Sequence, residues 1–154
     1  FGYLMFDERS PFAMMAVNDG RRESAIYIAP LSDIVAGRAQ WKLAGDFNEQ
    51  IEQGGLRGDK AWLVSTKDDP NGRLMITDAA KPDLTRARII NLPGNPVING
   101  LGNSKQGAWL QTVEGRSSGL WQVRDDGTAR QVKLPFTGTA SVLSTNRDDG
   151  SAFV

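Results

Sequence analysis

The sequence predicts an all-β chain in which a unit of four antiparallel strands is repeated. Short segments rich in β-branched and aromatic residues recur along the 154 residues at a nearly constant step. Seventeen glycines and seven prolines provide the many turns that short strands need. Helical patterning is nearly absent, because residues 31–39 allow at most one helical turn.

Three series of similar segments define the repeat. The first comprises FAMMAV, AWLV and AWLQ, which begin at residues 12, 61 and 108 with spacings of 49 and 47. The second comprises SAIYIAP, GRLMITD and GLWQVRD, which begin at residues 24, 72 and 119 with spacings of 48 and 47. The third comprises AQWKLAG, ARIINLP and ARQVKLP, which begin at residues 39, 87 and 129 with spacings of 48 and 42. Because the three series advance together, they indicate a true structural repeat.

A fourth strand precedes each strand of the first series. We expect these strands at residues 2–6, 51–56, 97–101 and 140–144. The turn sequences N-D-G, P-N-G, D-D-G and again D-D-G end at residues 20, 72, 127 and 150, where a hairpin would reverse. One unit is therefore four antiparallel strands in about 42 to 49 residues. That is the size and strand count of one blade of a β-propeller.

We therefore expect an incomplete β-propeller domain of about three and a half blades over residues 1–154. The blades would span residues 1–45, 46–93 and 94–135, and residues 136–154 would supply half of a fourth. A propeller closes on itself with about four to eight blades, so this number leaves sheet faces and edges uncovered. Two copies would supply seven blades' worth of strands, and we expect a homodimer or a swapped assembly.

The ends and the composition of the chain set further expectations. It opens on Phe1 without Met and ends inside a segment with the pattern of a strand, so we expect a piece of a longer protein. Eighteen basic and eighteen acidic residues give a formal net charge of zero, which argues against a nucleic-acid or acidic-membrane partner. No window holds the roughly 18 apolar residues of a membrane span. We expect a cytoplasmic location, with a periplasmic one left open.

Two absent residue types limit the chemistry. The chain has no cysteine, which excludes disulfides, thiolate metal sites and cysteine nucleophiles. It has no histidine, which removes the commonest general base and the commonest metal ligand. We therefore expect no catalytic residue, no cofactor-binding residue, no metal ligand and no cofactor in this chain.

One short motif nevertheless resembles a catalytic signature. Gly115-Arg116-Ser117-Ser118-Gly119 has the pattern G-x-S-x-G, the nucleophile elbow of serine hydrolases. The elbow works only where it follows a strand and opens a helix, with a histidine within reach of the serine. Here strands are expected on both sides, and the chain has no histidine. We interpret residues 115–119 as a hairpin loop.

Other motifs have equally simple structural interpretations. Arg57-Gly58-Asp59 spells the integrin tripeptide, but it falls where a turn between two strands is expected. The sequence GLGNS at residues 100–104 begins like a dinucleotide loop but lacks the third glycine and the following helix. Acidic pairs at residues 68–69, 125–126 and 148–149 lack the alternating spacing and closing glutamate of a calcium loop. We interpret these acidic pairs as turn residues.

Tryptophans occupy equivalent positions in successive units. Trp62 and Trp109 lie at the same place in the second strand, and Trp121 lies on the neighbouring strand. An aromatic ligand cage is one interpretation. Packing between blades is favoured, because stacked sheets need large side chains to fill the space between them. Trp41, on an outer strand, is expected to be half-exposed.

From about Asp19 onward the chain resembles the propeller domain of the prolyl oligopeptidase family of serine peptidases. The similar segments are DGRRESAIYIAPL, GDKAWLVSTKDDPNGRLMITDAAKPDLTRARIINLP and VKLPFTGTASVLSTNRDDGSAFV. Within residues 67–88, TKDDPNGRL leads through A-x-K-P-D-L into an outer strand, as in those propellers. The LPFTG of residues 134–138 also fits the opening of a blade. The resemblance covers some four-fifths of the chain and rests on blade-level patterns, without a catalytic signature.

The resemblance implies a parent serine-type endopeptidase in which a seven-bladed propeller covers an α/β-hydrolase domain with a Ser-Asp-His triad. The propeller of such an enzyme restricts entry to short peptides, which are cut after proline. This chain would be the middle to late half of the propeller, inactive by itself, with the hydrolase domain and short peptide substrates as partners of the parent. The family's propeller also lends an arginine and apolar side chains to substrate binding, but no position here matches them securely. The alternative is a stand-alone propeller that binds a protein or ligand, although WD-repeat and kelch signatures are absent.

Overall fold

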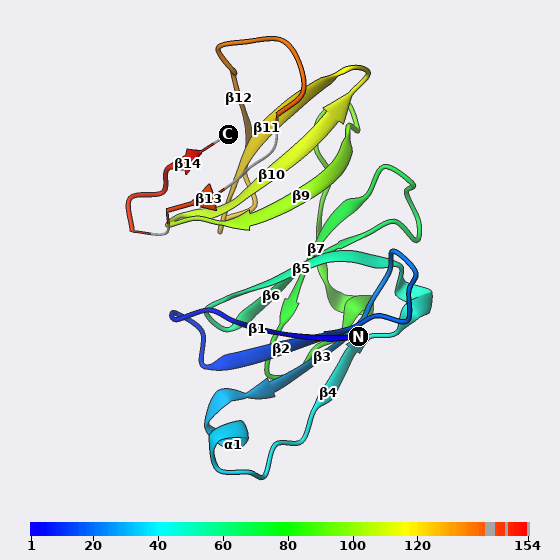
Figure 1. The fold of residues 1–154 in the computed structure, drawn as a ribbon, viewed down its shortest axis with the longest axis vertical. Helices are drawn as coiled ribbons and strands as arrows, with labels where there is room; N and C mark the ends of the chain where they lie inside the picture. Colours follow the sequence, from blue (N-terminus) through cyan, green and yellow to red (C-terminus); the bar gives the residue numbers. More distant parts are fainter. Residues whose placement is uncertain (141–143, 147, 154) are drawn as a thin grey trace. The chain divides into compact units, whose positions relative to one another are not determined.

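The computed structural model describes residues 1–140, 144–146 and 148–153. It divides into two compact units, Phe1–Ile89 and Ile90–Val154 (Figure 1). Three four-stranded antiparallel sheets, each with its strands in sequence order, account for most of the described residues. The fold is therefore nearly all-β, as predicted, and has the sheet architecture of a partial propeller. Among the described helices, none is long and apolar enough to cross a membrane.

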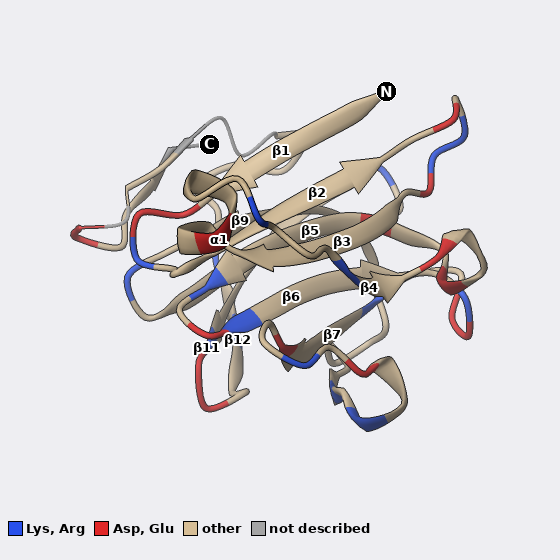
Figure 2. Cartoon of the chain, turned by 90° about the horizontal axis from the view of Figure 1, so that it is seen from below, with Lys and Arg blue, Asp and Glu red and all other residues tan. Residues whose placement is uncertain are grey.

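The first sheet of unit Phe1–Ile89 has the order β1-β2-β3-β4. Its strands are β1 (Gly2–Phe6), β2 (Phe12–Val17), β3 (Ala25–Pro30) and β4 (Lys42–Gly45). The helix α1 (Leu31–Val35) lies between β3 and β4 and is a little over one turn long, where the sequence predicted at most one turn. Figure 2 shows β1, β2 and β3 without any charged residue, which is the composition of strands that bury both of their faces.

The second sheet of the same unit has the order β5-β6-β7-β8. Its strands are β5 (Ile51–Arg57), β6 (Lys60–Ser65), β7 (Arg73–Asp78) and β8 (Arg88–Ile90). Two short 3-10 helices were not expected from the sequence. They are η1 (Phe47–Glu49), which precedes β5, and η2 (Leu84–Arg86), which precedes β8.

The two sheets of this unit pack on one another through a cluster of buried apolar side chains. Met14 and Ile28 come from the first sheet, and Leu56 and Leu63 come from the second. Gly54 on β5 lies at a close approach of the sheets: an added Cβ would be 3.1 Å from Leu63 Cδ2 and 3.2 Å from Met14 Sδ. A side chain at this position would have to displace its neighbours.

The unit Ile90–Val154 contains the third sheet, in the order β12-β11-β10-β9. Its strands are β9 (Val97–Asn103), β10 (Gly107–Glu114), β11 (Ser117–Arg124) and β12 (Ala129–Val132).

The end of this unit differs from the expectation. Two short strands, β13 (Ser144–Thr145) and β14 (Ala152–Phe153), form a two-stranded antiparallel sheet. Of the strand expected at residues 140–144, Ala140 is in no strand, Ser144 belongs to β13, and residues 141–143 lie outside the described residues. Ala140 is instead tied to Ser118, whose hydroxyl accepts its N–H at 2.9 Å. The division of the chain into blades at residues 45, 93 and 135 stays a prediction.

Candidate functional site

Unit Phe1–Ile89 contains a cleft of about 600 Å³, which we call the carboxylate cleft. Its walls come from β4 with η1, from the β6–β7 loop with β7, and from η2 with β8. Four carboxylates line it: Asp46, Glu49, Asp68 and Asp83. A volume of this size lies within the range of small-ligand and peptide pockets.

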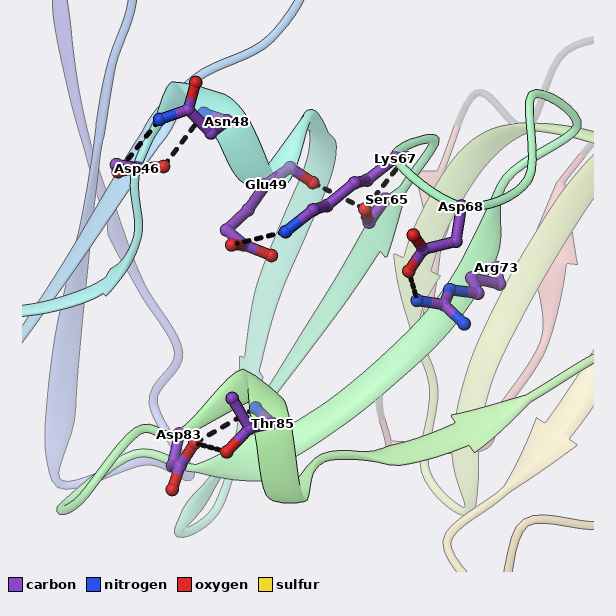
Figure 3. Close-up of polar contacts among 9 residues, drawn as sticks. All are labelled: Asp46, Asn48, Glu49, Ser65, Lys67, Asp68, Arg73, Asp83 and Thr85. Carbon is purple, nitrogen blue, oxygen red and sulfur yellow. Dashed lines mark hydrogen bonds and ion pairs between the residues drawn. The ribbon is translucent and has the colours of Figure 1, made fainter.

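Asp46 and Glu49 are positioned by η1. The Asp46 carboxylate accepts a hydrogen bond from the Asn48 N–H at 2.8 Å and so caps the 3-10 turn (Figure 3). The turn is attached to the second sheet, because the Ser65 hydroxyl donates to the Glu49 carbonyl at 2.5 Å. The Thr66 N–H donates to the Gln50 carbonyl at 3.0 Å. These bonds fix two of the cleft carboxylates relative to the start of the β6–β7 loop.

Two ion pairs involve the β6–β7 loop, one to η1 and one to the first residue of β7. The Lys67 ammonium lies 2.9 Å from a Glu49 carboxylate oxygen, and the Arg73 guanidinium pairs with Asp68 (Figure 3). The hydrogen bond to Glu49 raises the pKa of Lys67, and the negative charge of Glu49 adds to the effect. Both cations that line the cleft are therefore already matched by a carboxylate.

Asp83 caps the second 3-10 turn. Its carboxylate accepts hydrogen bonds from the Thr85 hydroxyl at 2.5 Å and from the Thr85 N–H at 3.0 Å (Figure 3). Its own N–H donates to the buried Thr77 hydroxyl at 3.0 Å, which holds the turn against β7. The hydrogen bond from the Thr85 side chain, chiefly, lowers the pKa of Asp83, so this carboxylate is charged at neutral pH.

The remaining lining of the cleft is apolar. It includes Leu43 and Ala44 on β4, Met75 on β7, Leu84 on η2 and Ile89 on β8. An apolar surface with a few fixed charges is a binding geometry. No histidine, cysteine or serine is among the lining residues of the cleft. Within the described ranges, no group of three or more potential side-chain ligands is placed to hold a metal ion.

A smaller hollow of about 340 Å³ lies in unit Ile90–Val154 beside Ser117, Ser118 and Gly119. The motif of which they are part is a hairpin, not a nucleophile elbow. Only Gly115 and Arg116 form the turn, because Glu114 of β10 already pairs with Ser117 of β11. The expected loop over residues 115–119 is therefore too long: the positive φ of +64° at Gly115 permits a two-residue turn, and strand pairing resumes at once.

The neighbouring serine has a structural role. The Ser118 hydroxyl donates to the Ala140 carbonyl at 3.1 Å and accepts the Ala140 N–H at 2.9 Å. Gln111 also donates to that carbonyl, at 2.5 Å. The serine in the centre of the motif, Ser117, is followed by strand and not by helix. The motif thus joins two strands and fastens the segment that follows the third sheet.

The Arg57-Gly58-Asp59 sequence forms the predicted turn between β5 and β6, since Arg57 pairs with Lys60. The turn is held against its surroundings on three sides. The Ser10 hydroxyl donates to the Gly58 carbonyl at 2.6 Å, and the Ala79 N–H donates to the Asp59 carbonyl at 2.8 Å. The Arg57 guanidinium lies over the Trp62 ring, 5.5 Å from its centroid. This geometry gives the tripeptide a structural role within the hairpin.

The other sequence motifs also lie in regular structure or turns. GLGNS follows no phosphate-loop geometry, because Gly100 to Asn103 belong to β9. Asp126 accepts the Thr128 N–H at 2.9 Å, and Asp149 accepts the Ser151 N–H at 2.8 Å. These are the turn contacts predicted for the acidic pairs.

The tryptophans of the first and second predicted series are buried. Trp62, Trp109 and Trp121 are each less than a tenth exposed, as expected for packing side chains. The Trp109 indole donates to the Gly150 carbonyl, 3.2 Å away in the β13–β14 connection, and so links this connection to the third sheet. Trp41 is partly exposed, as expected, but it lies one residue before β4.

Among the four carboxylates of the cleft, only Asp68 was expected from the sequence to have a role of its own, as a turn residue. Asp46-x-Asn48 and Asp83-x-Thr85 are local capping sequences and could have been read as such. The pair Glu49–Lys67 spans 18 residues across a strand, and no local pattern connects its members. The cleft forms where loops of two neighbouring sheets come together. Because these loops are far apart in the sequence, no local pattern predicts their contact.

Comparison with known proteins finds a solved structure with a similar fold. No protein-family model and no curated protein sequence matches the chain. It is similar to a solved structure from a study of two prolyl endopeptidases, which concerns the role of inter-domain dynamics in catalysis and specificity. The TM-score is 0.75 at 18% sequence identity, over 92% of this chain and 20% of that chain. The likeness shows a shared fold, and this chain spans about one fifth of the length of that endopeptidase.

Proposed function

We propose that the chain is a non-catalytic part of the propeller domain of a prolyl oligopeptidase-like serine peptidase. One observation supports this above the others. The likeness to a prolyl endopeptidase extends over 92% of the chain and involves successive four-stranded sheets. The resemblance of residues 67–88 to those propellers, inferred from sequence, points in the same direction.

In the parent enzyme this part would cover the active site of an α/β-hydrolase domain and admit only short peptides, which are cleaved after proline. The nucleophile and its histidine would be supplied by the hydrolase domain, because this chain has no histidine. The chain would then act by restricting access and by providing surface to the hydrolase domain. Its own hydrolytic activity would be nil.

The test begins with the gene. Its reading frame should extend beyond the 154 residues and encode a G-x-S-x-G between a strand and a helix, followed by a histidine. The full-length product should hydrolyse a short blocked glycyl-proline anilide, and it should leave the same sequence intact within a folded protein. Replacing the serine of the true elbow by alanine should abolish hydrolysis, while Ser117→Ala should leave it unchanged.

A second function, a stand-alone propeller that binds a protein or ligand, belongs to a different class. A stop codon soon after residue 154 would favour it and would contradict the peptidase proposal. So would a full-length protein that binds a partner but shows no hydrolysis of any proline-containing peptide.

A further inference from the structure

The carboxylate cleft has a charge surplus that its own residues do not neutralise. Four carboxylates and two cations line it, and both cations are engaged, Lys67 by Glu49 and Arg73 by Asp68. Asp46 and Asp83 are left as the excess negative charge. Arg86 approaches Asp83 only at 3.8 Å and its side chain is 89% exposed, so it is a weak partner.

The two surplus carboxylates are fixed in place rather than free to turn outward. Asp46 is held by the Asn48 N–H and Asp83 by both donors of Thr85. Each therefore presents its negative charge from a turn whose position is set by backbone hydrogen bonds. Little conformational entropy is lost when such preorganised groups meet a cation.

The surface between these carboxylates suits aliphatic side chains. Leu43, half-exposed on β4, faces the same cleft as Met75 of β7 and Leu84 of η2. A lone inorganic cation would leave this apolar surface wet. A chain with apolar groups on either side of its positive charge would cover it.

One wall of the cleft is an edge strand. β4 pairs with β3 through Leu43 and Lys42 and stands last in the order of its sheet. Edge strands offer unpaired backbone N–H and C=O groups to an added extended segment. The cleft thus combines a strand edge, an apolar surface and fixed negative charge over about 600 Å³.

We propose that the carboxylate cleft binds an extended peptide segment in which a lysine or arginine stands between apolar side chains. The cation would pair with Asp46 or with Asp83, and the flanking side chains would contact Leu43 and Leu84. This site is separate from peptide hydrolysis and does not depend on the proposed parent enzyme. It requires only the residues of unit Phe1–Ile89.

The test uses the whole 154-residue chain and the blocked peptide acetyl-Leu-Arg-Val-Arg-Leu-amide, followed by calorimetry and by amide shifts in NMR spectra. We expect saturable binding with a dissociation constant below about 1 mM, which is the weak end of specific affinities. The shifts should centre on Leu43, Met75 and Thr85. Raising the salt concentration from about 0.05 to about 0.5 M should weaken binding, since exposed charges are screened.

Two matched controls separate charge from fold. The double variant Asp46→Asn with Asp83→Asn should weaken binding by about tenfold, which is the size expected from the loss of two exposed charge pairs. The fold should be kept, because asparagine can still cap both turns. Asp126→Asn alters the same type of Asp-x-Thr turn outside the cleft and should leave the affinity unchanged. A peptide with citrulline in place of both arginines keeps the shape without the charge and should bind at least tenfold more weakly than the arginine peptide.

The proposal is overturned by any of four results. These are no binding of the arginine peptide at about 1 mM, equal affinity for the citrulline peptide, equal weakening by Asp126→Asn, or shifts that map away from the cleft. The citrulline comparison leaves the protein unaltered, so it remains decisive even if the double variant is destabilised. A cleft filled by a second copy would show as a dimer that the double variant dissociates and that excludes the peptide.

Discussion

The sheets β1–β4 and β5–β8 have the same strand order and adjacent places in the chain, yet they differ in how their faces are covered. In β5–β8 both faces of the second strand are buried: Leu63 on one side is 0% exposed and Trp62 on the other is 2% exposed. In β1–β4 the face that carries Met14 and Ile28 packs against β5–β8, and the opposite face is buried at Ala13 of β2 and Ala29 of β3. The opposite face carries Leu4 and Phe6, which are 46% and 51% exposed.

The difference is concentrated at the edge strand β1, which is mostly exposed although its residues are apolar. β1 and β2 contain no charged residue, and Leu4 and Phe6 pair with Met15 and Ala13 on the open face. A strand that is apolar on both faces is typical of a sheet packed between two layers. The comparison therefore indicates that the open face of β1–β4 is built to be covered, as a blade inside a propeller is covered by its neighbours.

The largest effect should come from the shared face of the two sheets. Leu63→Ala should lower the free energy of unfolding by about 2–5 kcal/mol, because the side chain is fully buried and leaves a cavity. Leu4→Ala is the matched control on the open face and should cost much less, about 1 kcal/mol or below. Urea unfolding followed by tryptophan fluorescence measures both. Equal losses would show that the two faces do not differ in packing.

A smaller effect should come from the close approach at Gly54. Gly54→Ala should destabilise the chain by about 1–3 kcal/mol, because the new methyl meets Leu63 and Met14 at 3.1 and 3.2 Å. Gly55→Ala adds the same methyl one residue later, where nothing lies within 4 Å, and should be neutral or slightly stabilising. The melting temperatures of the two variants measure this difference in stability. A loss in Gly55→Ala as large as that in Gly54→Ala would contradict the close packing of the sheets.

These positions also show what the sequence could and could not predict. The strands around Ala61 and Ala108 were predictable, because alternation and turn residues act locally and the repeat reinforced them. The close approach at Gly54 was not predictable, since β5 has the local pattern of a polar strand with two adjacent glycines. The carboxylate cleft was missed for the same reason: Glu49 and Lys67 meet only because η1 is fastened to the end of β6. The hairpin at Ser117 was predictable from the strands on both sides, but strand pairing right up to the turn was not.

The open face should affect association more than stability. If a second copy covers this face when the 154-residue chain is alone, Leu4→Ser with Phe6→Ser should shift a dimer to monomer. The free energy of unfolding of the monomer should change by no more than about 1 kcal/mol, since both side chains are half-exposed. Sedimentation velocity over a range of concentrations measures the association. A wild-type chain that is monomeric throughout that range would rule out the homodimer.

The smallest effect concerns the charge of Asp83 in acid. The Thr85 hydroxyl holds the pKa of this carboxylate below its usual 3.8, so the folded state favours the charged form. The stabilisation is therefore present above the pKa that Asp83 has in the unfolded chain, and it is lost as the pH falls through the lower pKa of the folded state.

Asp83→Asn keeps a capping oxygen but cannot titrate, so the melting temperature of this variant should fall less between pH 5 and pH 2 than that of the wild type. Thr85→Val removes the hydroxyl donor and should reproduce part of this flattening, because the pKa of Asp83 then returns toward 3.8. Identical acid profiles for all three proteins would show that the lowered pKa of Asp83 adds nothing to stability.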